Sequence, residues 1–115
     1  MMNIKDKKIN SQRNFTLVSL EGALDKVGLE NIRASLDEVL ASTETQYFVL
    51  DLSDLSYVNS EGVGYLLTLH YRLLKRDLKF VLVGARANVK DVLEVIGMLS
   101  IVPYFDTFEL FEQSL

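Results

Sequence analysis

Two short runs of apolar residues constrain the fold of this chain more than any other feature of its sequence. The runs cover residues 47–52 and 80–83, and each is apolar almost throughout. A continuous apolar run of this length is typical of a central strand that is covered on both faces. Between the runs, apolar residues recur at helical spacing from Val63 to Leu74. Strands that alternate with helices predict a mostly parallel sheet with right-handed crossovers.

Helices are predicted wherever apolar residues recur every three or four positions. This spacing predicts helices over residues 28–41 and 61–75. A third helix is predicted to begin near Asn88, and Gly97 follows it as a natural C-terminal stop, because glycine readily adopts the left-handed backbone conformation. Asp106 is predicted to cap a short C-terminal helix, with a glutamate three residues later completing a capping box.

The remaining segments predict strands and a turn. Residues 15–20 are rich in β-forming residues and predict a strand, whereas residues 21–25 predict a bend and Ile101–Val102 a short last strand. Residues 1–14 are polar and rich in lysine, which predicts an edge strand or a loose arm. The whole pattern predicts an α/β fold with a four- or five-stranded, mixed but mostly parallel sheet and about four helices packed mainly on one face.

Composition narrows the classes of function. The chain has 115 residues, the length of a single domain over 1–115, and 49% of them are hydrophobic. Its 16 acidic residues outnumber 12 basic ones, so nonspecific binding to nucleic acid is not expected. With no cysteine and one histidine, neither a metal centre nor another cofactor is expected. No apolar stretch reaches the ~18 residues of a membrane span, so we expect a cytoplasmic protein without direct membrane insertion.

The segment from Asp51 to Leu67 is the most distinctive candidate site. It leads from a buried strand through a loop into a helix whose first turn contains Asn59, Ser60 and Glu61. A helix N-terminus offers unpaired N–H groups and a partial positive charge, so this turn could bind an anion or carry a phosphorylation switch. The same residue types are also ordinary helix caps. Composition alone leaves both interpretations open.

Two further features of this segment suggest chemistry that its residues do not support. Gly62 and Gly64 allow close approach of another backbone and begin like a dinucleotide-binding fingerprint. Leu67 occupies the third glycine position, however, and no acid follows at the required distance. Asp51 and Asp54 flank the expected strand end and could suggest acid–base catalysis or Mg²⁺ binding, but no histidine accompanies them. The sequence therefore predicts no catalytic residue and no metal site.

Three motifs resemble the STAS domains, and specifically the stand-alone anti-sigma factor antagonists, or anti-anti-sigma factors. Residues 20–25 are similar to the L-x-G-x-L-D bend of that family, and residues 49–64 resemble its strand followed by D-S-[ST]-G. Residues 80–99 are similar to its closing strand and helix. The motifs follow the order of the family, and the resemblance covers roughly residues 15–105. Residues 106–115 are then left as the C-terminal helix.

The resemblance implies a protein-binding switch and not an enzyme. Family members bind an anti-sigma factor that is also a serine kinase, and the unphosphorylated antagonist thereby frees the sigma factor for transcription. Phosphorylation at the helix start breaks the complex, and a phosphatase restores it. We expect a monomer or a weak dimer. By the resemblance, Asp25 lies near the helix start, where it either shapes the docking surface or caps the first helix. The implied partner-binding surface comprises Asp25, Asn59, Ser60, Glu61, Gly62 and Gly64.

The sequence departs from the family at the phosphorylated position. The usual phosphoacceptor is the serine or threonine directly before the glycine, and here that position is Glu61. Asn59 replaces the aspartate of the family motif, and Ala87 replaces a proline ahead of the third helix. Three interpretations stay open. Glu61 mimics a phosphate, Ser60 is the phosphoacceptor instead, or phosphorylation is lost and the domain is a constitutive scaffold.

A second class of function follows from the same resemblance. STAS domains also occur in anion transporters and lipid-transport complexes, so the chain could be an accessory or scaffold subunit that binds such a partner or a small ligand without phosphorylation. Its length and the lack of an apolar span favour the switch over this alternative. An enzyme is disfavoured, because no nucleophile–base pair and no phosphate-binding loop motif are apparent.

Overall fold

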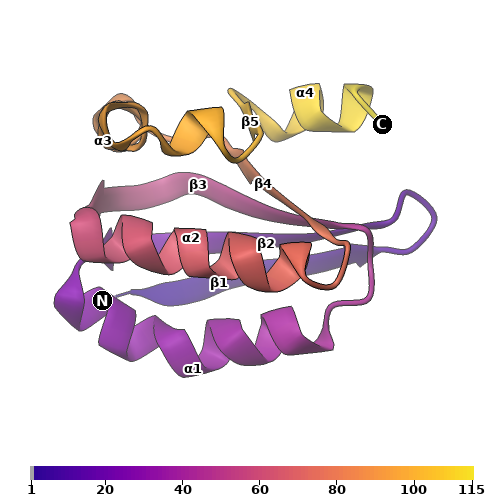
Figure 1. The fold of residues 1–115 in the computed structure, drawn as a ribbon, viewed down its shortest axis with the longest axis horizontal. Helices are drawn as coiled ribbons and strands as arrows, with labels where there is room; N and C mark the ends of the chain where they lie inside the picture. The colour runs from indigo at the N-terminus through magenta and orange to yellow at the C-terminus, as the bar shows by residue number, and fades with distance from the viewer. Residues whose placement is uncertain (1) are drawn as a thin grey trace.

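A five-stranded sheet in the order β1-β2-β3-β4-β5 runs through the centre of the protein (Figure 1). The computed structural model describes residues 2–115. β2 (Phe15–Leu24), β3 (Tyr47–Val58), β4 (Lys79–Val83) and β5 (Tyr104–Phe105) are parallel neighbours. β1 (Asn3–Asn10) pairs antiparallel with β2 at one edge. The mixed, mostly parallel sheet predicted from the sequence is confirmed.

Helices connect each parallel strand to the next along the chain. α1 (Lys26–Ser42) follows β2, α2 (Ser60–Leu74) follows β3, and α3 (Ala87–Ile96) follows β4. Gly97 ends α3 in the left-handed conformation with φ of 88°, as its type and position predict. α4 (Phe108–Gln113) follows β5. Within residues 2–115, none of these helices combines the length and the apolar character that a bilayer-spanning helix needs.

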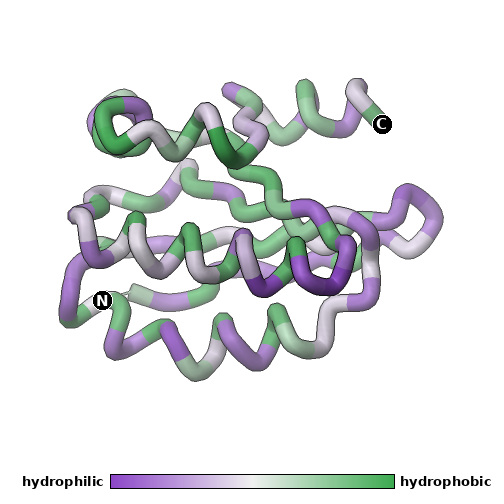
Figure 2. The backbone as a smooth tube through the Cα atoms, viewed as in Figure 1, coloured by the Kyte–Doolittle hydropathy of each residue, from purple (hydrophilic) through white to green (hydrophobic). Residues whose placement is uncertain are grey.

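The larger hydrophobic core lies between one face of the sheet and the first three helices. Phe48 and Leu50 of β3 point into it, and α1, α2 and α3 contribute side chains such as Leu36, Leu66 and Leu93, all of them buried. Figure 2 shows hydrophobic residues along the central strands and a mixture of hydrophobic and hydrophilic residues along α1 and α2. The helices are thus amphipathic and bury one stripe each.

A smaller aromatic core covers the opposite face of the sheet. Val49, which alternates with Phe48 and Leu50 along β3, belongs to this second cluster. Phe111 of α4 anchors it, with its ring centroid 5.9 Å from that of Phe15. Three helices therefore contribute to the larger core and the short α4 to the smaller one, which confirms the prediction that the helices pack mainly on one face.

The structure corrects two predictions on strands. The predicted bend over residues 21–25 is wrong, because β2 stays paired with β3 as far as Leu24, and Gly22, with φ of 114°, accommodates an irregular step in the pairing. The predicted strand Ile101–Val102 is also wrong. A short 3₁₀ helix, η1 (Met98–Ser100), precedes these residues, and the Ile101 N–H donates a hydrogen bond back to the Met98 carbonyl. Strand pairing therefore begins only at β5.

Two predictions on element ends also need correction. The cap of α4 is Thr107, whose hydroxyl oxygen accepts from the Leu110 N–H at 3.1 Å, and not Asp106, whose carboxylate pairs with Lys90. Asp51 and Asp54 lie within β3 instead of flanking its end, because β3 runs on to Val58, well beyond the apolar run.

Candidate functional site

The starts of α1 and α2 lie side by side at one end of the sheet (Figure 1). They meet there because β2 and β3 are parallel neighbours, so both strands end at the same edge, and each leads directly into a helix. A backbone hydrogen bond from the Asn59 N–H to the Leu24 carbonyl, 3.3 Å long, ties the two strand ends together. The fold thereby brings Asp25 next to the segment from Asn59 to Gly64.

Both helices begin with a side-chain cap. Asp25 Oδ1 accepts a hydrogen bond from the Gly28 N–H at 2.8 Å, and Asn59 Oδ1 accepts one from the Gly62 N–H at 3.0 Å. Each cap pairs an N–H group that the helix itself leaves without an acceptor. Asp25 therefore does cap the first helix, one of the two roles that the sequence left open, and both capping side chains are only partly exposed.

The two glycines in the first turns of α2 differ in their surroundings. Gly62 is buried, and a Cβ atom there would lie 2.4 Å from the Leu24 carbonyl oxygen. Gly64 is exposed, and a Cβ atom there would meet nothing within 4 Å. Gly62 is thus required for the close approach of α2 to β2, whereas Gly64 leaves an open strip on the helix surface.

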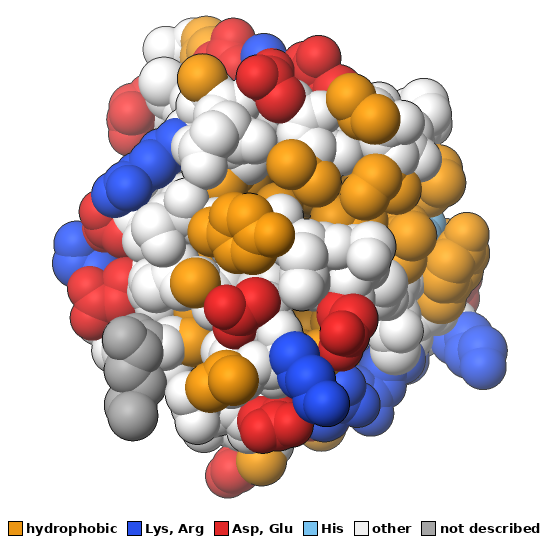
Figure 3. Space-filling model, turned by 90° about the vertical axis from the view of Figure 1, so that its left-hand side faces the viewer, with side chains coloured by type: hydrophobic (Ala, Val, Ile, Leu, Met, Phe, Trp, Pro, Cys, Tyr) orange, Lys and Arg blue, Asp and Glu red, His pale blue; other side chains and the backbone are white. Residues whose placement is uncertain are grey.

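Ser60 and Glu61 occupy the first two positions of α2, and both are exposed. The Glu61 carboxylate lies where the helix dipole stabilises a negative charge. Within residues 2–115, Glu61 has no cationic partner within 4.0 Å. Figure 3 looks onto this end of the molecule, where hydrophobic side chains gather over the centre and upper right and charged side chains surround them. The exposed turn therefore carries a charge that no cationic side chain among the described residues neutralises.

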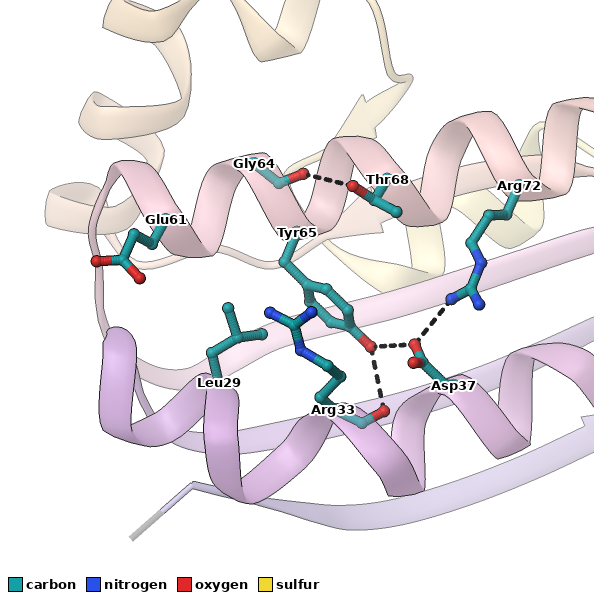
Figure 4. A pocket seen from close by; sticks show the side chains of 8 residues that line it. All are labelled: Leu29, Arg33, Asp37, Glu61, Gly64, Tyr65, Thr68 and Arg72. Carbon is teal, nitrogen blue, oxygen red and sulfur yellow. Dashed lines mark hydrogen bonds and ion pairs between the residues drawn. The ribbon is translucent and has the colours of Figure 1, made fainter.

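A groove of about 430 Å³ runs between α1 and α2 from this end of the molecule (Figure 4). Glu61 and Gly64, which the sequence assigned to the partner-binding surface, also line this groove. The sequence reasoning missed its other walls. The lining residues are Leu29, Arg33 and Asp37 of α1 and Glu61, Gly64, Tyr65, Thr68 and Arg72 of α2.

A hydrogen-bond network joins the two walls of the groove (Figure 4). The Tyr65 hydroxyl donates to Asp37 Oδ1 at 2.7 Å, and Arg72 Nη1 donates to the same oxygen at 2.9 Å. The Arg33 guanidinium carbon lies 5.4 Å from the centre of the Tyr65 ring. Burial, together with the neighbouring Asp37 carboxylate, raises the pKa of Tyr65 far above its usual value, so its hydroxyl stays a donor at neutral pH.

The STAS domain family model matches residues 6–110 of this chain. The chain belongs to the STAS domain family. An anti-sigma F factor antagonist from Paenibacillus polymyxa is 23% identical over 99 residues, which cover 86% of this chain and 85% of that protein. These findings confirm the resemblance seen in the sequence.

Solved structures of other proteins share the fold of this STAS domain. An anti-sigma factor antagonist from Mycobacterium paratuberculosis matches with a TM-score of 0.81 at 19% identity, over 95% of this chain and 89% of that one. The unphosphorylated form of SpoIIAA matches with a TM-score of 0.72 at 20% identity, over 95% and 94%. The phosphorylated form of this Bacillus protein matches with a TM-score of 0.66 at 19% identity, over 96% and 98%.

The two strand carboxylates of this STAS domain have structural partners. Asp51 Oδ1 accepts from the Ser53 N–H at 3.0 Å, and Asp54 Oδ2 lies 2.6 Å from Lys5 Nζ. The hydrogen bond and positive charge of Lys5 lower the pKa of the Asp54 carboxyl. Among residues 2–115, no three side chains of the metal-binding types converge on a common point. These carboxylates therefore form bonds within β3 and to the edge strand β1.

Proposed function

We propose that this STAS domain is an anti-sigma factor antagonist, which binds an anti-sigma factor of the serine-kinase class and so regulates sigma-factor-dependent transcription. It acts by binding and catalyses no reaction itself. The observation that carries the proposal is the exposed start of α2, where Ser60, Glu61 and Gly64 face solvent. The name and sequence similarity of the Paenibacillus polymyxa relative support an anti-sigma factor as the partner.

The proposed contact surface divides into supporting and contacting residues. Asp25 and Asn59 use their side-chain oxygens as helix caps, and Gly62 is buried against the end of β2, so these residues hold the surface in shape. Ser60 and Glu61 present their side chains to a partner. The bare surface at Gly64 allows a partner's backbone to approach α2 closely.

Glu61 gives this surface a permanent negative charge at the position that the resemblance assigns to the phosphoacceptor. A carboxylate carries one charge, whereas a phosphate carries about −1.5 to −2 at pH 7. We propose that the partner accepts this single charge and that the phosphorylation cycle is lost. Ser60 precedes Glu61 by one residue, which turns its side chain by about 100° around the helix. A kinase aligned on residue 61 would therefore not reach Ser60.

The test captures binding partners from an extract of the source organism with four immobilised proteins: the wild type, Glu61→Ser, Glu61→Gln and Ser60→Ala. Bound proteins are identified by mass spectrometry, and a captured anti-sigma factor is purified and incubated with each variant and ATP. We expect the wild type to capture an anti-sigma factor of the kinase class and to take up no phosphate. The Glu61→Ser variant is expected to be phosphorylated on residue 61.

Each other outcome contradicts a defined part of the proposal. Phosphate on Ser60 of the wild type, absent from Ser60→Ala, would make Ser60 the phosphoacceptor. Capture by Glu61→Ser and Glu61→Gln but not by the wild type would mean that Glu61 blocks binding as a phosphate mimic. If no variant captures an anti-sigma factor, the proposed function is wrong, and recovery of a transporter or lipid-transport protein would favour the accessory-subunit alternative.

A further inference from the structure

Arg33 is a cation without an anionic partner in the groove between α1 and α2. Within residues 2–115, no carboxylate lies within 4.0 Å of its guanidinium group. Asp37, one helical turn further along α1, is the obvious candidate, but it is already bound by Tyr65 and Arg72. The charge of Arg33 is therefore available to a group that enters from outside.

The groove holds this guanidinium ready for such a group. Tyr65 is 6% exposed and fixed by its bond to Asp37, so its ring forms a rigid support under Arg33. An arginine that lies over an aromatic ring keeps its N–H edge free to bind a planar anion with two parallel hydrogen bonds. Figure 4 shows the guanidinium reaching into the space between Leu29 and Tyr65. Asp37 and Tyr65 act here as positioning residues.

The other charges of the groove favour an anion of single charge. Arg33 and Arg72 carry two positive charges, and Asp37 and Glu61 balance them with two negative ones. Because these charges sum to zero, the groove offers no net attraction to offset the larger desolvation cost of a phosphate group, whose charge is near −2, whereas a singly charged carboxylate loses less hydration. A carboxylate also matches the fork of a guanidinium in shape.

The shape of the groove favours a protein segment as the source of the carboxylate. The groove is open along its length and lined mostly by polar side chains, unlike the deep apolar cavities that hold small molecules. It is also continuous with the proposed contact surface, since Glu61 and Gly64 belong to both. Arginine and tyrosine are the residue types that most often dominate the binding energy of protein interfaces.

We propose that the groove between α1 and α2 is an acidic-peptide site, in which Arg33 binds an aspartate or glutamate side chain of the partner protein. The inference rests on the proposed function for the identity of that partner. The partner segment lies along the open strip at Gly64, and its carboxylate meets the guanidinium over the Tyr65 ring. The partner then meets a negative charge at Glu61 and a positive charge at Arg33. Two contacts of opposite sign fix the direction in which the partner lies across the two helices.

The test needs no anti-sigma factor. The full ¹⁵N-labelled chain is titrated with the capped pentapeptide Gly-Gly-Glu-Gly-Gly, and with matched peptides that carry lysine or phosphoserine at the centre. We expect the glutamate peptide to shift the Arg33 Nε–H signal and the Gly64 and Thr68 amide signals saturably. The Arg33→Gln variant is expected to weaken this binding about fivefold. Arg13→Gln, which removes an exposed arginine far from the groove in the β1–β2 connection, is expected to leave it unchanged.

Several outcomes would overturn the inference. The inference is wrong if the phosphoserine peptide binds more tightly than the glutamate peptide, or if the lysine peptide shifts the signals of the groove. It is also wrong if Arg33→Gln binds the glutamate peptide as tightly as the wild type does, or if no peptide shifts any signal. The test also separates this inference from the proposed function. If the glutamate peptide binds but no anti-sigma factor is captured, only the proposed function fails. If an anti-sigma factor binds Arg33→Gln as tightly as the wild type, only the acidic-peptide site fails.

Discussion

Replacing Gly62 by alanine is expected to destabilise the protein, although alanine is the better helix former. The added methyl group would lie 2.4 Å from the Leu24 carbonyl oxygen and 2.9 Å from Cγ2 of Val58. Relief of these contacts requires the start of α2 to move away from β2 by about 1 Å, and such overpacking typically costs about 1–3 kcal/mol. The movement also strains the bond from the Asn59 N–H to Leu24, worth about 1 kcal/mol.

The intrinsic preference for alanine offsets about 1 kcal/mol of this cost. We therefore expect Gly62→Ala to lower the free energy of unfolding by about 2 kcal/mol. Gly64→Ala is the matched control, because its methyl group meets nothing within 4 Å, and it is expected to raise the same quantity by up to about 1 kcal/mol. Urea unfolding followed by far-ultraviolet circular dichroism measures both. A Gly62→Ala variant as stable as the wild type would refute the packing argument.

Two further predictions concern a cap and a buried hydroxyl. In urea titrations, Asn59→Ala is expected to lower the free energy of unfolding by about 0.5–2 kcal/mol, because the Gly62 N–H loses its acceptor, and Ser60→Ala to change it by less than about 0.5 kcal/mol. Equal effects would mean that the cap is misassigned. Since Tyr65 has a raised pKa in the folded state, the folded chain binds more protons above about pH 10, and its stability falls as pH rises further. Tyr65→Phe removes the bond to Asp37, and melting temperatures between about pH 9 and 11.5 are expected to fall less steeply in this variant; parallel slopes would contradict the assignment.

The sequence correctly predicts features that depend on residues close together in the chain. The apolar run at residues 47–52 correctly predicted that β3 lies in the centre of the sheet, because such a run is stable only when both faces of the strand are covered. The spacing of apolar residues predicted the ends of α1 and α2 to within two residues, because an amphipathic helix buries one stripe of its surface. Gly97 ended α3 because a left-handed residue at a helix end strongly favours glycine.

Features that depend on tertiary contacts could not be predicted in this way. Asp106 and Thr107 are both capable caps, and the choice of Thr107 depends on where Phe111 packs on the sheet. Gly62 and Gly64 look equivalent in the sequence, and only the approach of Leu24 from another strand distinguishes them.

The same limit explains why the groove was missed. Arg33 and Tyr65 are far apart in the chain, and they meet only because α1 and α2 pack side by side. The single signal in the sequence was that Arg33 and Asp37 lie one turn apart on α1, a spacing that usually predicts a simple ion pair on the helix surface. That pair does not form, and Arg72 and Tyr65 of the other helix bind Asp37 instead.

The position of Met2 has a practical consequence for attaching this protein to a surface or a label. Met2 is buried beside Gly28 and lines a hollow with Asp25, at the same end of the molecule as the start of α2. Figure 1 shows the C-terminus at the opposite end. A tag fused ahead of Met2 would compete for space with a partner bound at the proposed contact surface. A tether at Leu115 instead orients every copy with the starts of α1 and α2 facing the solution.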